Sequence, residues 1–167
     1  MITKPLTAAR LRELLHYNKR TGVMTWIAAP RCHPRMRGKK AGSARHSRGG
    51  KYYVRVKVDG GNYSLSRLAF LWVNGVWPEY EVDHKNGDSL DNRWRNLREA
   101  THTQNTWNRK DNPARSLPMG VRSLPCGRFQ ARITKNKVQY CIGRFDSVTE
   151  AKSAYEAARR LAYGDFA

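Results

Sequence analysis

The spacing of apolar and polar residues changes several times along the chain, and each change predicts a short element. Three leucines between residues 11 and 15 recur at helical spacing behind Thr7, a residue type that caps helices, so a short helix is expected there. A Thr-Gly turn at residues 21–22 then leads into a strand at residues 23–27. The chain therefore begins with a small helix and a strand.

Strict alternation follows at residues 51–58, where basic residues alternate with aromatic or β-branched ones. The sequence DGGN turns the chain into YSLS, which predicts a hairpin with one basic face. Residues 67–73 form a compact apolar run that favours a core helix. Trp72, Trp77 and Trp94 are expected to pack in the core or against hairpins.

The last 48 residues also combine strand and helix patterns, but their strands come first and the helix last. Strands are predicted at residues 121–123, 128–134 and 138–145, separated by turn residues. An S-x-x-E capping box at residues 147–150 opens an amphipathic helix that Gly164 can end. The predicted fold class is α+β, and its C-terminal part is a three-stranded antiparallel sheet with one helix on one face.

Composition changes this picture because the chain is strongly cationic. Its 167 residues hold 32 Lys and Arg against 13 Asp and Glu, a net charge of +19. No apolar run approaches the roughly 18 residues of a membrane span, and the N-terminus lacks the apolar core of a secretory signal, so an intracellular, non-membrane protein is expected. The aromatic content argues for a folded chain, whose partner is then a polyanion.

Cysteine usage argues against two other classes of site. The three cysteines form no CxxC pair, so neither a disulfide framework nor a structural zinc site is expected.

The charge is distributed unevenly along the chain. Residues 1–80 hold 16 basic and 3 acidic residues, residues 81–112 hold 6 of each, and residues 113–167 hold 10 and 4. Two arms for polyanion binding thus flank a neutral centre suited to binding a cation or to acid–base chemistry. Residues 31–50 look like a flexible basic loop, either a solvated surface stretch or a phosphate contact. The N-terminal residues chosen for DNA binding are Lys39, Lys40, Arg55 and Lys57.

The neutral centre contains VDHKNGDSLDNRWRNLREATHTQNTWN at residues 82–108. Asp83 and His84 end a strand-like stretch, a turn follows at residues 86–88, and a short helical segment carries Asn105. Adjacent side chains on a strand point to opposite faces, so a carboxylate and an imidazole there can do two jobs. One can hold a metal while the other reaches a water molecule.

Residues 66–108 resemble the HNH nucleases, specifically the phage and intron-encoded homing endonucleases of the ββα-metal fold. The resemblance rests on the DH pair, the NG turn, the DNRxxNL string and the Asn that follows at the third metal-site position. One departure is Ser66-Arg67, where the family often has His-Arg.

The resemblance implies a role for each matching residue. Asp83 and Asn105 would ligate one divalent metal, Mg²⁺ or Mn²⁺. His84 would be the general base, Asn96 would hold its ring, and Asn92 would close the hairpin.

Two neighbouring residues are assigned no definite role in the metal site. Asn108 is the rival of Asn105, because it lies one helical turn further on and could share its face. His102 is expected to be structural or solvent-facing.

The segment from residue 120 onward, with GVR, GRFQARI, IGRFDSVTEAKSAYEAA and YGDFA, resembles the DNA-binding domain of plant ethylene-response factors. That domain lays its sheet in the major groove of DNA. The resemblance implies four DNA-contacting arginines, which are Arg122, Arg128, Arg132 and Arg144. Contact with guanine and contact with phosphate alone both remain open.

The sequence therefore predicts a site-directed DNA endonuclease of the homing type, of phage or intron origin and acting in a bacterial cytoplasm. It would be a monomer that needs no protein partner, binds double-stranded DNA and nicks one strand. The predicted domains are an N-terminal basic DNA-binding or support region (1–80), the HNH motif (81–109), a linker (110–118) and the ethylene-response-factor-like domain (119–167). The rival function is a DNA-binding regulator with an inactive nuclease core, and RNA binding is a third option.

Overall fold

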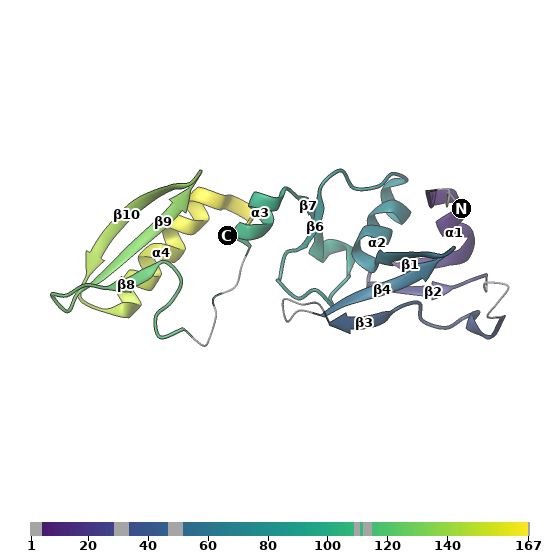
Figure 1. Ribbon diagram of the computed structural model, residues 1–167, viewed down its shortest axis with the longest axis horizontal. Coiled ribbons are helices and arrows are strands. Elements are labelled where there is room, and N and C mark those ends of the chain that lie inside the picture. The colour runs from purple at the N-terminus through teal and green to yellow at the C-terminus, as the bar shows by residue number, and fades with distance from the viewer. Residues whose placement is uncertain (1–4, 29–33, 47–51, 109–110, 112–114, 167) are drawn as a thin grey trace. The chain divides into compact units, whose positions relative to one another are not determined.

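The computed structural model describes residues 5–28, 34–46, 52–108, 111 and 115–166, and the chain divides into two compact units (Figure 1). The units are Met1–His102 and Thr103–Ala167. Each combines helices with small antiparallel sheets, so the predicted α+β fold class is confirmed. Within the described residues, no helix is both long and apolar enough to cross a bilayer.

In its described residues, the first unit contains three small sheets and two α-helices. Its sheets have the strand orders β1-β2, β3-β4-β5 and β6-β7. The elements in chain order are α1 (Ala8–Leu14), β1 (Leu15–Asn18), β2 (Val23–Trp26), the 3-10 helix η1 (Pro34–Met36), β3 (Ser43–His46), β4 (Tyr52–Val58), β5 (Gly61–Ser64), α2 (Leu65–Asn74), β6 (Glu81–His84), the 3-10 helix η2 (Trp94–Asn96) and β7 (Leu97–Ala100).

Helix α2 carries the centre of the first unit's core. Leu65, Leu68 and Leu71 recur every three residues and are at most 1% exposed, which turns one stripe of the helix inward. The helix ends at Gly75, whose left-handed φ of 82° lets its N–H bond Leu71 O at 3.0 Å. The three tryptophans expected to pack against the core do so.

Two segments of the first unit differ from the sequence-based prediction. Helix α1 is capped by Thr7 as expected, but it ends at Leu14, and Leu15 begins strand β1. The reason is that Leu15 and Tyr17 alternate with exposed residues, which is strand spacing. The basic loop expected at 31–50 holds η1 and the exposed edge strand β3, whereas its residues 31–33 and 47–50 lie outside the described part.

The second unit is a three-stranded antiparallel sheet, of order β10-β9-β8, with one long helix packed against it (Figure 1). This is the predicted layout of the C-terminal part. Its elements are α3 (His102–Trp107, whose first residue closes the first unit), β8 (Val121–Ser123), β9 (Phe129–Lys135), β10 (Val138–Phe145), α4 (Val148–Tyr163) and the 3-10 helix η3 (Gly164–Phe166).

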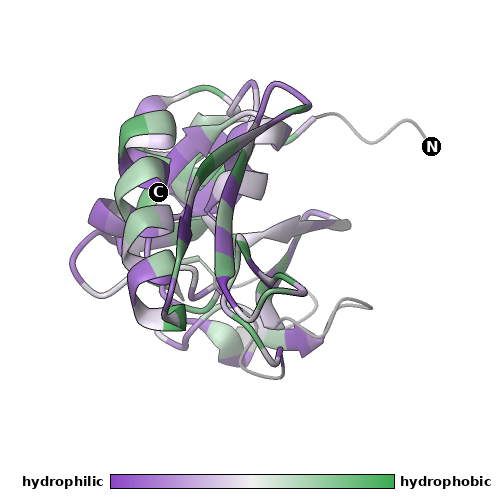
Figure 2. Ribbon diagram, turned by 90° about the vertical axis from the view of Figure 1, so that its left-hand side faces the viewer, coloured by the Kyte–Doolittle hydropathy of each residue, from purple (hydrophilic) through white to green (hydrophobic). Residues whose placement is uncertain are grey.

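The predicted cap and the alternation of the strands explain how this unit forms. Ser147 accepts the Glu150 N–H at 3.2 Å, which starts α4. Ala131 and Ile133 of β9 point toward Ala151 and Tyr155 of α4 and form the small core. Figure 2 shows how hydrophobic and hydrophilic residues alternate along these strands and around the helix.

The boundary between the two units differs from the domain limits expected from the sequence. Strands β6 and β7 belong with the N-terminal residues, whereas α3 after its first residue belongs with the C-terminal unit. The HNH motif expected at 81–109 is therefore shared between the units. As functional domains, the four sequence-based ranges stay predictions.

Candidate active site

Strands β6 and β7 place the central motif in a hairpin with a fixed register. Asp83 pairs with Arg98 and His84 pairs with Leu97, and the N–H of Lys85 bonds Asn96 O at 2.8 Å where the loop begins. Asp83 is 5% exposed and His84 is 6% exposed. The adjacent acid and imidazole predicted from the sequence are thus both buried at the end of one strand.

Asp83 is held by a residue that sequence reasoning missed. Arg98, directly opposite on β7, places both Nε and Nη2 at 2.8 Å from Oδ2 of Asp83. Both side chains are largely buried, and a buried carboxylate needs such a counter-charge. The sequence offered no sign of this pair, because strand register is not readable from RWRNLRE alone.

His84 is held by Asn92. The ring Nε2 lies 3.3 Å from Oδ1 of Asn92, while Nδ2 of the same amide donates to Leu90 O at 3.1 Å. The amide oxygen can only accept, so this bond requires a proton on Nε2 and leaves the lone pair of a neutral ring on Nδ1. Nδ1 is therefore the atom suited to take a proton.

The environment of His84 favours that neutral ring. Burial lowers its pKa below the ordinary value of about 6.5, while the hydrogen bond to Asn92 and the nearby carboxylates of Asp83, Asp88 and Asp91 act in the opposite direction. Burial is the larger effect, so His84 is uncharged at neutral pH. A neutral imidazole is what a general base requires.

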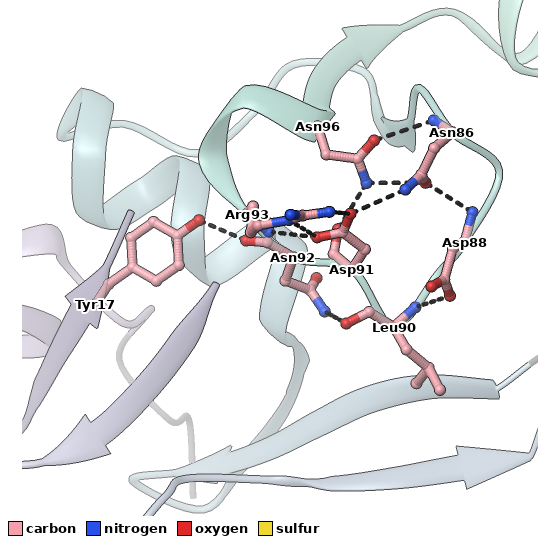
Figure 3. Close-up of polar contacts among 8 residues, drawn as sticks. All are labelled: Tyr17, Asn86, Asp88, Leu90, Asp91, Asn92, Arg93 and Asn96. Carbon is pink, nitrogen blue, oxygen red and sulfur yellow. Dashed lines mark hydrogen bonds and ion pairs between the residues drawn. The ribbon is translucent and has the colours of Figure 1, made fainter. Parts of the chain in front are cut away.

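The side chain of Asn96 bonds the loop in the structure, and its role of holding the His84 ring stays a prediction. Its Oδ1 accepts the N–H of Asn86 at 3.0 Å, and its Nδ2 donates to Asn86 Oδ1 at 3.0 Å and to Asp91 O at 2.7 Å (Figure 3). Asn96 is the last residue of η2, and its hydrogen bonds to Asn86 and Asp91 tie the loop between the strands together. Asn92, expected only to close the hairpin, contacts the His84 ring through its side-chain oxygen.

The loop between β6 and β7 is further braced by Asp91. Its carboxylate accepts from Asn86 Nδ2 at 2.9 Å and from Arg93 Nε at 2.7 Å (Figure 3). The hydrogen bond from Arg93 lowers the pKa of Asp91 to about 2, so this carboxylate is ionised across the physiological range. Asn86 and Arg93 thus engage Asp91 within the loop.

The remaining motif residues lie on or beside α3. His102 is exposed and pairs with Glu81 at 3.0 Å, which confirms its structural reading. Asn105 lies within α3 and Asn108 directly follows it, both in the second unit, so the choice between them as a ligand that acts with Asp83 stays a prediction.

The carboxylate of Asp83 is of a donor type that hard divalent cations bind. Among the residues that the structure describes, no group of three or more His, Cys, Asp and Glu could hold a metal. Mg²⁺ is commonly bound by one or two carboxylates that leave the other positions to water and substrate phosphate. Asp83, one carboxylate beside a neutral imidazole, suits that arrangement.

Two sheet faces gather basic side chains. In the second unit, α4 covers the face that holds Ala131, and the strand alternation turns three of the predicted arginines to the opposite face. Gln130 stands between Arg122 and Arg144 in one cross-strand row. Arg122, Arg132 and Arg144 lie on this face, whereas the fourth predicted arginine, Arg128, directly precedes β9 and pairs with Asp146 at 2.8 Å.

In the first unit, the valines of β4 enter the core while the residues between them stay outside. Arg55 and Lys57 are exposed on this outer face, and Arg45 of β3, which the sequence did not single out, pairs across from Tyr53 on the same face. Lys39 and Lys40 are exposed just before β3. Each unit thus presents a basic sheet face.

Comparison with known proteins agrees with the central motif. The model of the HNH endonuclease family matches residues 63–106. An uncharacterized HNH endonuclease of Acanthamoeba polyphaga mimivirus is 30% identical over 120 residues, which make up 71% of this chain and 63% of the relative. The chain therefore spans less than two thirds of that relative. A solved structure of DNA binding and cleavage by the HNH homing endonuclease I-HmuI is 22% identical, with a TM-score of 0.40, and covers 57% of this chain and 51% of that one.

Residues 63–106, from within β5 to within α3, match the model of the HNH endonuclease family. The predicted resemblance to the HNH nucleases is confirmed for this part of the chain. The resemblance of residues 119–167 to ethylene-response factors stays a prediction.

Proposed function

We propose that the protein is a metal-dependent DNA endonuclease in which His84 activates the water that attacks a phosphodiester bond. The observation that carries this proposal is the buried, neutral ring of His84, whose Nε2 is held by Asn92 beside the carboxylate of Asp83. The match to the HNH endonuclease family spans residues 63–106, which include this pair, and supports the proposal.

The proton transfers follow from the geometry of the ring. Nδ1 of His84 takes a proton from water as the oxygen bonds phosphorus, and the bond from phosphorus to the 3′ oxygen breaks. The leaving oxygen takes a proton from solvent, so atoms and charge balance. Asn92 keeps the ring in the tautomer that leaves Nδ1 basic.

The metal role is proposed from the donor types. Asp83 and Asn105 would hold Mg²⁺ or Mn²⁺ together with water and phosphate oxygens. Such a cation, when bound, stabilises negative charge on the phosphoryl and leaving oxygens. Arg98 keeps the Asp83 carboxylate oriented when no cation is bound.

The two basic sheet faces would bind double-stranded DNA. The net charge of +19 supports a binding mode governed by phosphate contacts and therefore by salt concentration. One DH pair per chain supports a monomer that nicks one strand at a time. A homing role is consistent with two basic faces that bind and select the DNA site and a separate DH pair that cuts it.

Supercoiled plasmid DNA incubated with Mg²⁺, Mn²⁺ or EDTA tests the proposal. Wild type is expected to convert it to nicked circles only with metal, and His84→Ala is expected to bind DNA without cutting. His102→Ala is the matched control, because His102 is an exposed histidine of the same unit. Binding by wild type without cutting under every metal condition would instead support the rival regulator with an inactive core. Linear product without a nicked intermediate would overturn the nicking monomer.

A further inference from the structure

We infer that the β1–β2 hairpin positions the general base, and that Tyr17 is the residue through which it does so. The inference rests on the proposed role of His84. Tyr17 lies on β1, outside the HNH match at residues 63–106, so nothing in the HNH motif itself assigns it a role.

The link between Tyr17 and His84 passes through one residue. The Tyr17 hydroxyl donates to the backbone oxygen of Asn92 at 2.6 Å, as Figure 3 shows, and the side-chain oxygen of Asn92 faces Nε2 of His84 at 3.3 Å. Tyr17 is 1% exposed and Asn92 is 4% exposed. The hairpin therefore holds Asn92 through the backbone oxygen of Asn92, and Asn92 holds the His84 ring through its side chain.

The turn of the hairpin contacts the same segment at two further points. The N–H of Trp94 bonds Lys19 O at 3.0 Å. Gly22 approaches so closely that a Cβ there would lie 2.4 Å from the backbone carbon of Asn92. The turn between β1 and β2 thus packs directly on the backbone on both sides of Arg93.

Two properties suit Tyr17 and Asn92 to fixing the position of the His84 ring. The distance of 3.3 Å from His84 to Asn92 is at the long end for a hydrogen bond, so a small shift of Asn92 would release the ring. Burial also raises the pKa of Tyr17, so its hydroxyl keeps its proton and remains a donor. Because catalytic groups tolerate displacements of only about 0.5 Å, Tyr17 would act as a positioning residue for His84.

The first test is Tyr17→Phe, which removes only the hydroxyl. The expected result is a loss of kcat of about 10-fold, as is usual when a residue that orients a reacting group is removed. KM for DNA is expected to stay unchanged, since Tyr17 is buried. Tyr63→Phe is the control, because Tyr63 is a partly buried tyrosine of the same unit whose ring stacks on Trp77 instead.

The second test moves the turn instead of the hydroxyl. Gly22→Ala places a methyl group against Asn92, whereas Gly75→Ala carries the same left-handed strain with nothing within 4 Å of its Cβ. If the turn sets the position of Asn92, Gly22→Ala loses kcat while Gly75→Ala at matched thermal stability retains it. Equal kcat in the two variants would overturn the inference.

A third measurement does not depend on cleavage. The ¹⁵N chemical shifts of the His84 ring, read by NMR at one fixed pH, report which nitrogen carries the proton. They are expected to move in Tyr17→Phe and stay in Tyr63→Phe. Unchanged shifts would overturn the inference, even if kcat falls. Absence of cutting by wild type would defeat the proposed function, and the ring shifts would still decide whether Tyr17 positions His84.

Discussion

Asp83 and Arg98 stand opposite each other on β6 and β7, and the guanidinium of Arg98 holds the carboxylate of the predicted metal ligand at 2.8 Å. The pair places a fixed positive charge beside the position proposed for the metal. A bound cation would share the Asp83 carboxylate with this guanidinium. Arg98 thereby stabilises the hairpin without metal and competes with metal for the same negative charge.

Arg98→Gln is therefore expected to make folding more dependent on metal. The variant removes the guanidinium that lies 2.8 Å from the buried Asp83 carboxylate, which lowers the free energy of unfolding in EDTA by about 3 kcal/mol. Mg²⁺ should restore more stability in the variant than in wild type, because its rival for the carboxylate is gone. Thermal unfolding with and without Mg²⁺ measures this. Arg95→Gln, at an exposed arginine of η2, is the control, and an equal Mg²⁺ shift in all three proteins would contradict the expectation.

Asn92 and Asn96 are expected to fail in different ways when each is changed to Ala. Asn96→Ala removes three loop hydrogen bonds from a buried side chain and should cost about 3 kcal/mol of stability, at about 1 kcal/mol for each bond. Asn92→Ala removes the contact to His84 and should lower kcat more than stability. Unfolding and nicking assays on both variants separate the two effects. A larger loss of kcat in Asn96→Ala, with the larger loss of stability in Asn92→Ala, would show that Asn96 orients the His84 ring.

The central motif was predictable because local spacing carries it. Asp83, His84, the turn after them and the capped helix α4 follow from patterns within a few residues. Arg98, Tyr17 and the approach of Gly22 depend on which distant segments meet. Strand register and tertiary contacts of this kind leave little trace in the sequence, and the contact of Asn92 with the His84 ring could not be predicted for the same reason.

Cleavage should depend on pH through His84. Burial lowers its pKa, so the acidic limb of kcat/KM is expected below the ordinary value of about 6.5, with a tenfold loss per pH unit beneath it. Asn92→Ala should move the limb to still lower pH, because the hydrogen bond to Asn92 raises this pKa. Nicking rates measured in one buffer series between about pH 4.5 and about pH 8 test both shifts. A limb above pH 6.5 would show that His84 is not the group that titrates.

The free energy of unfolding should also depend on pH through His84. Between the lowered pKa of folded His84 and about 6.5, the unfolded chain binds the extra proton, so stability rises with pH in that window. The contribution of neutral His84 is thus complete above about pH 6.5 and is lost as the pH falls toward the folded pKa. Comparing the pH dependence of thermal unfolding for wild type and His84→Gln isolates it, and identical curves would contradict the assignment.

In the second unit, Gly120 is expected to tolerate no side chain. It has a left-handed φ of 76°, and a Cβ there would lie 2.2 Å from the ring of Tyr155, which is part of the small core. Gly120→Ala should destabilise this unit by more than the roughly 1 kcal/mol that left-handed strain alone costs. Gly127→Ala is the matched control, since it has the same strain and nothing within 4 Å of its Cβ. Equal melting temperatures would show that the ring moves aside without cost.

The arginines on the sheet of the second unit should differ in what they contribute to DNA binding. Arg144 is exposed, whereas Arg128 already pairs with Asp146 at 2.8 Å. Arg144→Gln is therefore expected to reduce the log–log slope of affinity against salt by about 0.9, the value for one phosphate contact on duplex DNA, and Arg128→Gln by less. Lys152→Gln on α4 should leave the slope unchanged, because that helix covers the other face of the sheet. Fluorescence anisotropy across a salt series measures the slopes. A loss with Lys152→Gln as large as that with Arg144→Gln would remove the sheet face from the proposed DNA interface.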